Sequence, residues 1–150
     1  MMESPITNFA KVDENLWRGA RPDADGVAWL VFNGCKTVIS LEWEQSDIPA
    51  ANIIEIRLAD WEPLPRFAPV IEDRHIRSVL AAIKTSPKPI FIHCRSGQNR
   101  TGVAVAAYRI IIKNDPIEDV IAEMKSYGGI WADSDVDYVR SLETRRLLFL

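Results

Sequence analysis

Cys94 and Arg100 lie in the segment His-Cys-Arg-Ser-Gly-Gln-Asn-Arg-Thr-Gly, residues 93–102, where an apolar run ends and a helical pattern begins. A helix N-terminus carries roughly half a positive charge and several unpaired N–H groups, so it attracts anions and favours a thiolate over a thiol. The planar fork of Arg100 can hold two oxygens of one phosphate, and Gly97 permits the positive φ that turns successive N–H groups toward an anion. These residues predict the capture of a phosphate monoester and its attack by Cys94.

The chain around this segment predicts alternating strands and helices. Apolar and β-branched runs predict a small hairpin over 9–18, broken by the Gly-Ala-Arg-Pro of 19–22, and strands over 36–41, 53–58 and 90–93. Helical spacing predicts helices over 23–33, 101–113, 116–127 and 133–148, and a further helix that opens at Pro69 and has its apolar face marked by residues 76–83. We therefore expect an α/β fold with a central, mostly parallel β-sheet flanked by helices. In such sheets ligands bind beyond the carboxyl ends of the strands, which is where Cys94 falls.

The chain has 150 residues, of which 47% are hydrophobic and 26% are charged, a composition typical of a soluble globular protein. We expect one domain spanning residues 1–150. The net charge of −3 and the pI near 5.4 argue against a nucleic-acid or anionic-membrane partner. The sequence contains no apolar run of about 18 residues, and its first residues lack the pattern of a signal peptide. We expect a cytoplasmic monomer.

The two cysteines, Cys35 and Cys94, have neither the number nor the spacing of a disulfide framework or a zinc site. We therefore expect no metal and no cofactor. Cys35 starts its predicted strand whereas Cys94 ends a parallel one, so several residues at about 3.3 Å each separate them, beyond disulfide reach. We expect Cys35 to be a core residue. His75 lies in a charged stretch and is expected on a solvated helix face.

The pattern His-Cys-x-x-Gly-x-x-Arg-Thr-Gly at 93–102 resembles the signature of the cysteine-based protein tyrosine phosphatase superfamily. The size of the chain and the mid-chain position of this loop are similar to the dual-specificity branch rather than the low-molecular-weight phosphatases. The Leu-Trp-Arg-Gly-Ala-Arg-Pro of residues 16–22 also resembles the opening of atypical bacterial, plant and fungal members.

This resemblance implies a role for each residue of the loop. Cys94 would attack phosphorus and form a phosphocysteine intermediate, and Arg100 would stabilise the transition-state charge. Thr101 would donate its hydroxyl to the sulfur, although it also fits an ordinary first-turn residue. His93 would orient the loop, which is compatible with a hydrogen-bonded core histidine. The expected phosphate-binding residues are Arg95, Ser96, Gly97, Gln98, Asn99 and Arg100.

The leaving oxygen needs a proton, and a positioned carboxylic acid can supply about 10²–10⁴ in rate. The acid must come from another loop at the same edge of the sheet. The family places its acidic Asp on a loop at about the position of Asp60, so the resemblance implies Asp60. Glu62, in the same Asp-Trp-Glu-Pro segment, is the second candidate. The remaining alternative is that neither residue is the acid.

The sequence therefore predicts a phosphomonoester hydrolase, acting on phosphotyrosine in proteins and by extension on phosphoserine or phosphothreonine. The first alternative is a phosphoinositide or inositol polyphosphate phosphatase. Such relatives carry several Lys or Arg in the loop, whereas this loop adds only Arg95. An RNA 5′-triphosphatase is disfavoured by the acidic chain. A phosphate-binding pseudophosphatase is disfavoured because candidates for the Cys, the Arg and the acid are all present.

Overall fold

The structure, a computed structural model, describes residues 3–42, 52–58 and 71–150. Its centre is a five-stranded sheet in the order β1-β2-β5-β3-β4. The strands are β1 (Ala10–Lys11), β2 (Leu16–Ala20), β3 (Thr37–Ser40), β4 (Ile54–Arg57) and β5 (Ile90–Cys94). The short edge strand β1 runs antiparallel to β2, and the other pairs are parallel. The mostly parallel sheet predicted from the sequence is confirmed.

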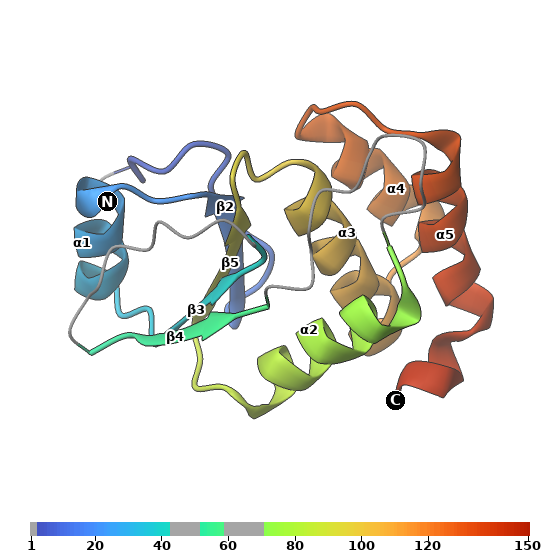
Figure 1. Ribbon diagram of the computed structural model, residues 1–150, viewed down its shortest axis with the longest axis horizontal. Helices are drawn as coiled ribbons and strands as arrows, with labels where there is room; N and C mark the ends of the chain where they lie inside the picture. Colours follow the sequence, from blue (N-terminus) through green and yellow to red (C-terminus); the bar gives the residue numbers. More distant parts are fainter. Residues whose placement is uncertain (1–2, 43–51, 59–70) are drawn as a thin grey trace.

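The strand register brings three carboxyl ends together. Ala20 at the end of β2 pairs with Cys94, and Ser40 at the end of β3 pairs with His93. Because β5 lies between β2 and β3, the segments that follow all three strands meet at one edge of the sheet (Figure 1). This edge is where the loop after Cys94 begins.

Helices cover both faces of the sheet (Figure 1). Helix α1 (Ala24–Phe32) packs against one face through its Trp29, which lies in a cluster with Trp17 and Phe91 of the sheet. The opposite face carries the larger core and the remaining helical segments. These are α2 (Asp73–Thr85), α3 (Asn99–Ala107), the π-helical turn η1 (Tyr108–Ile112), α4 (Ile117–Ser126), α5 (Asp133–Thr144) and the 3₁₀ turn η2 (Arg146–Phe149).

Helix α3 follows the site loop and is buried on every side. Its residues from Thr101 to Ala107 are all buried, and most of them are small. Small side chains allow close packing, so the helix lies directly against the sheet and its N-terminus is fixed below the loop. A Cβ added to Gly102 would lie 3.0 Å from the ring of Trp131, which shows how closely the next layer approaches.

Two local predictions are wrong. Residues Gly19 and Ala20 continue strand β2 instead of breaking it, because they pair with β5. His75 is buried, at 3% exposed, rather than solvated. It occupies the N-terminal capping box of α2, where the Glu72 backbone N–H donates to its Nδ1 at 3.0 Å. His75 falls on the same helix face as Val79 and Ile83, both buried.

The prediction for Cys35 is confirmed. Thr37 is level with Ile90, so Cys35 lies about six residues below Cys94 along the sheet, roughly 20 Å away. Both cysteines are free. Burial raises the pKa of the Cys35 thiol to about 11, against weaker opposing hydrogen bonds. In the described part of the chain, no helix is long and apolar enough to cross a membrane.

Candidate active site

Cys94 is the last residue of β5, and its side chain is 2% exposed. Residues 95–98 form the loop, and α3 begins at Asn99. The sulfur therefore lies between a strand end and a helix N-terminus, as the sequence predicts. The unpaired N–H groups and positive end of α3 favour a negative charge at this point.

Gly97 is required by two features of the loop. Its φ is +73°, a conformation that L side chains rarely adopt. A Cβ at this position would also lie 2.6 Å from the backbone nitrogen of Ala20 and from the carbonyl carbon of Gly19. The loop is therefore seated directly on the end of β2, and only glycine permits that approach.

Three carbonyl groups of the loop are held by donors from the N-terminal part of the chain. The Arg21 backbone N–H donates to the Arg95 carbonyl at 3.2 Å. The Asn8 side-chain amide donates to the Ser96 carbonyl at 2.8 Å. The Arg18 guanidinium donates from Nη2 to the Gly97 carbonyl at 3.0 Å.

These three bonds fix the direction of the loop's N–H groups. A trans peptide is planar, so its N–H points opposite to its C=O. Because the carbonyls face the N-terminal segment, the N–H groups of Ser96, Gly97 and Gln98 point away from it. Among the described residues, no backbone carbonyl accepts a hydrogen bond from these three groups. Within the described part of the chain, the loop therefore presents a row of N–H donors that no backbone carbonyl occupies, which is the arrangement of an anion-binding nest.

Arg100 and Thr101 complete the first turn of α3. Arg100 donates from Nη1 to the carbonyl of Leu41 at 3.3 Å, which directs its side chain toward the end of β3. The Thr101 side chain is fully buried, and its hydroxyl has no hydrogen-bond partner among the described residues. The predicted hydrogen bond from Thr101 to the Cys94 sulfur is thus not formed in this structure, and the buried hydroxyl can still donate one hydrogen bond.

The side chains of Gln98 and Asn99 do not point toward the centre of the loop. Gln98 donates from Nε2 to the carbonyl of Tyr127 at 3.2 Å, and Asn99 donates from Nδ2 to the carbonyl of Ile130 at 2.7 Å. The turn after α4, with two glycines at positive φ, lies against both side chains. These residues can therefore contribute backbone N–H groups to an anion while their side chains anchor the loop.

Glu42 forms a buried charged cluster with Arg21 and His93. Its side chain is 1% exposed and accepts hydrogen bonds from both Nε and Nη2 of Arg21. The Nδ1 of His93 lies 3.4 Å from Glu42 Oε2 and 3.4 Å from the Cys94 carbonyl. Burial alone would raise the pKa of Glu42, but the hydrogen bonds and positive charges of His93 and Arg21 lower it to about 2. The cluster joins the ends of β2, β3 and β5 beneath the loop.

Replacing Glu42 by glutamine should destabilise the fold in a pH-dependent way. The folded-state pKa is depressed from 4.5 to about 2, so the ionised carboxylate stabilises the native state above its unfolded pKa. The shift corresponds to about 3 kcal/mol at neutral pH. We expect this difference between wild type and Glu42→Gln to shrink below about pH 5 and to vanish near pH 2.

Urea unfolding across this pH range measures the difference in free energy of unfolding. Glu118→Gln is the matched control, because Glu118 pairs with Arg140 on the exposed surface and should show no measurable change. An equal effect of the two substitutions, or a Glu42→Gln effect that does not depend on pH, would show that the buried carboxylate contributes nothing through its charge.

Several residues of this site were not predicted from the sequence. Glu42 directly follows the strand predicted over 36–41, and Asn8, Arg18 and Arg21 received no role. The signals were present, since Arg18 and Arg21 lie in the 16–22 segment that resembles the family. Asp60 and Glu62, the two candidate acids, lie outside the described residues. No group of three or more His, Cys, Asp or Glu side chains in the described part of the chain could hold a metal ion.

A strand end, a cysteine, a row of N–H groups that point away from the N-terminal segment and an arginine at a helix N-terminus define a cysteine-based phosphatase fold. Residues 3–134 match the family described as a dual-specificity-type protein tyrosine phosphatase fused to NAD⁺ kinase. The chain belongs to this family, within the dual-specificity branch of the cysteine-based protein tyrosine phosphatases.

Two relatives illustrate the range of this branch. The dual-specificity protein phosphatase TpbA of Pseudomonas aeruginosa is 30% identical over 134 residues, which cover 88% of this chain and 59% of that protein. The inositol diphosphatase DSP5 of Arabidopsis thaliana is 22% identical over 150 residues, covering 95% of this chain and 73% of that protein. The chain thus spans less than two thirds of the length of TpbA.

Solved structures agree with the architecture. The crystal structure of TpbA superposes with a TM-score of 0.77 at 28% identity and covers 99% of this chain and 94% of that one. A cysteine-to-serine variant of TpbA has been solved in complex with phosphotyrosine, with a TM-score of 0.77, 26% identity, and coverage of 99% and 93%. The catalytic domain of the Saccharomyces cerevisiae phosphatase SIW14, at 18% identity and a TM-score of 0.74, shares the fold over 91% and 85% of the two chains.

Proposed function

We propose that this chain is a single catalytic domain that hydrolyses phosphate monoesters of proteins, phosphotyrosine foremost. The observation that supports the proposal most strongly is the loop itself. Its carbonyls are held outward, its N–H groups donate to no backbone carbonyl among the residues that the structure describes, and Cys94 lies at its start. A dianionic phosphate would be bound by these donors and by the fork of Arg100. The TpbA variant solved with phosphotyrosine supports this substrate class for a relative of the same fold.

The reaction we propose has two steps. The Cys94 thiolate attacks phosphorus, the bond from phosphorus to the leaving oxygen breaks, and Asp60 gives its proton to that oxygen. A water molecule then attacks the phosphocysteine while the Asp60 carboxylate takes its proton, and the thiolate leaves. The unsatisfied Thr101 hydroxyl would donate to the sulfur at this second step, when negative charge returns to it. His93 and the Glu42 cluster would hold the loop in place throughout.

Asp60→Asn should separate the two candidate acids. We expect it to reduce kcat by about 10²–10⁴-fold with an alkyl or phenyl phosphate, whose leaving oxygen needs a proton. The loss should be much smaller with a nitrophenyl phosphate, because that leaving group departs as a stable anion. Glu62→Gln serves as the matched control and should retain activity with both substrates. The reverse pattern would transfer the role to Glu62, and no loss in either variant would remove both.

The principal alternative is hydrolysis of inositol phosphates. It is favoured by the plant relatives, which are inositol diphosphatases. The loop of this chain argues against it, because Arg95 is its only cation besides Arg100 and neighbouring phosphates need further positive charge. Comparing kcat/KM for phosphotyrosine peptides, phosphoserine peptides, inositol pyrophosphates and RNA 5′-triphosphate ends tests the choice. We expect the phosphotyrosine peptide to rank first, and an inositol pyrophosphate in first place would overturn the assignment.

We also propose that the chain acts as a cytoplasmic monomer. Both cysteines are free, and a thiol nucleophile must stay reduced to act. The net charge of −3 gives no reason to expect a nucleic-acid or anionic-membrane partner.

A further inference from the structure

Arg18 is a charged residue in the interior of strand β2, and its side chain is only 1% exposed. Burying a charge in an apolar layer is costly unless the group is paired or has another use. Burial lowers the pKa of the Arg18 guanidinium, while Tyr127, Glu123 and Cys94, when ionised, act in the opposite direction.

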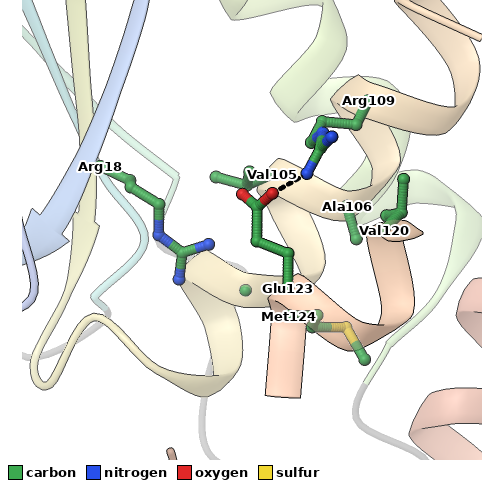
Figure 2. A pocket seen from close by; sticks show the side chains of 8 residues that line it. Arg18, Val105, Ala106, Arg109, Val120, Glu123 and Met124 are labelled. Carbon is green, nitrogen blue, oxygen red and sulfur yellow. Dashed lines mark hydrogen bonds and ion pairs between the residues drawn. The ribbon is translucent and has the colours of Figure 1, made fainter. Parts of the chain in front are cut away.

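The contacts of Arg18 are unusual for a buried arginine. Its Nη2 donates to the Gly97 carbonyl at 3.0 Å, and its guanidinium carbon lies 3.7 Å from the centre of the Tyr127 ring. Its Nε has no hydrogen-bond partner among the described residues. Figure 2 shows the side chain reaching into a narrow pocket opposite Glu123, whose carboxylate is bonded to Arg109. Within the described part of the chain, the side-chain hydrogen bond of Arg18 is therefore directed to the loop.

That bond determines the orientation of one peptide. Gly97 has positive φ, and glycine has the widest choice of backbone conformations, so the peptide between Gly97 and Gln98 is the part of the loop most able to rotate. With its carbonyl held by Arg18, the N–H of Gln98 points to the opposite side. A rotation of this peptide would instead direct a carbonyl oxygen toward the bound phosphate. Stacking on Tyr127 fixes the plane of the guanidinium.

We propose that Arg18 is a positioning residue that holds the Gly97–Gln98 peptide in the orientation needed for anion binding, with Tyr127 fixing its plane. Tyr127 also accepts a hydrogen bond from Gln98 at its carbonyl, so it holds the loop at two points. The turn after α4 and strand β2 would therefore act together on one N–H group. This inference rests on the proposed function only in that the anion is taken to be the substrate phosphate.

Binding of tungstate, measured by calorimetry in a Cys94→Ser background, tests the proposal without requiring turnover. We expect Arg18→Met to weaken binding by about 10- to 100-fold, because one preorganised donor is lost or misdirected. Tyr127→Leu should weaken binding less, and Arg18→Lys should recover part of the loss because it keeps the charge without the stacked plane. The change in the NMR chemical shift of the Gln98 backbone amide on adding tungstate should become smaller from variant to variant in the same order as the binding weakens.

Arg109→Met is the matched control, because Arg109 lines the same pocket but its side chain donates to Asp115 and Glu123 instead of to the loop, within the part of the chain that the structure describes. It should leave tungstate binding within about twofold of the parent, whatever it costs in stability. Unchanged binding in Arg18→Met, or an equal loss in Arg109→Met, would overturn the proposal. If Arg18→Met does not fold, unchanged binding in both Tyr127→Leu and Arg18→Lys overturns it instead. A wild type that binds tungstate in an Arg18-dependent way but hydrolyses no phosphate ester would refute the proposed function and leave this inference standing.

Discussion

Cys94→Ser is expected to abolish turnover of an aryl phosphate, with a loss on the order of 10⁴-fold or more. A serine hydroxyl is far less acidic than a thiol and stays protonated at neutral pH, so it cannot replace a thiolate. Binding of phosphate or tungstate should persist, because the N–H groups of the loop and the Arg100 fork remain. It should become tighter if the lost thiolate charge had repelled the dianion.

Cys35→Ser is the matched control for this substitution. Cys35 is a buried cysteine on the other side of the sheet, its thiol donates to the Thr37 carbonyl at 3.3 Å, and a serine can keep that bond. We expect near-normal kcat and some loss of stability. Iodoacetamide at neutral pH should inactivate the wild type and modify Cys94 only, since burial raises the pKa of Cys35 to about 11. Normal turnover in Cys94→Ser would refute the mechanism.

Arg100→Lys is expected to reduce kcat/KM by about 10²–10³-fold, or about 2.7–4 kcal/mol of transition-state stabilisation. Lysine keeps the charge but loses the planar fork that holds two oxygens, and it is not equivalent to arginine in a bidentate site. The lost contact with the Leu41 carbonyl would also free the side chain from the end of β3. Steady-state kinetics on one aryl phosphate measures the effect.

Arg95→Lys gives the comparison within the same loop. Arg95 is exposed and contributes its backbone carbonyl to the bond with the Arg21 N–H, which lysine preserves. We expect its kcat/KM to stay within about threefold of wild type. A larger loss in Arg95→Lys than in Arg100→Lys would mean that the principal phosphate ligand had been misassigned.

The loop and the general architecture could be predicted because their signals are local. An apolar run, a glycine and an arginine at a helix start indicate a phosphate-binding loop, and all of them lie within a short stretch of the sequence. The parallel sheet followed from the alternation of strands and helices, and the separation of Cys35 from Cys94 followed from strand direction alone. These are properties that tertiary contacts seldom override.

The supporting residues could not be predicted because their partners lie far away in the sequence. In the sequence, Glu42 is a polar residue that follows a strand and suggests only a loop. Its role depends on Arg21, which follows β2, and on His93 of β5, and both lie beside it only in the folded chain. Arg18 contacts a carbonyl that is 79 residues away. Charged residues are seldom found within or directly after a buried strand, yet Arg18 and Glu42 occupy such positions. A charge at such a position indicates a functional residue or a buried ion pair, and this signal would have identified both residues.

We expect Cys94 to carry the phosphoryl group during turnover. This role is tested by rapid mixing with an aryl phosphate, a denaturing quench within the first turnover, and mass spectrometry of the peptide containing Cys94. We expect a phosphoryl adduct on Cys94, a burst of released aryl alcohol no larger than the enzyme concentration, and neither in Cys94→Ser. Turnover by wild type with the phosphoryl group on another residue, or with no adduct under conditions that preserve phosphocysteine, would contradict this role of Cys94.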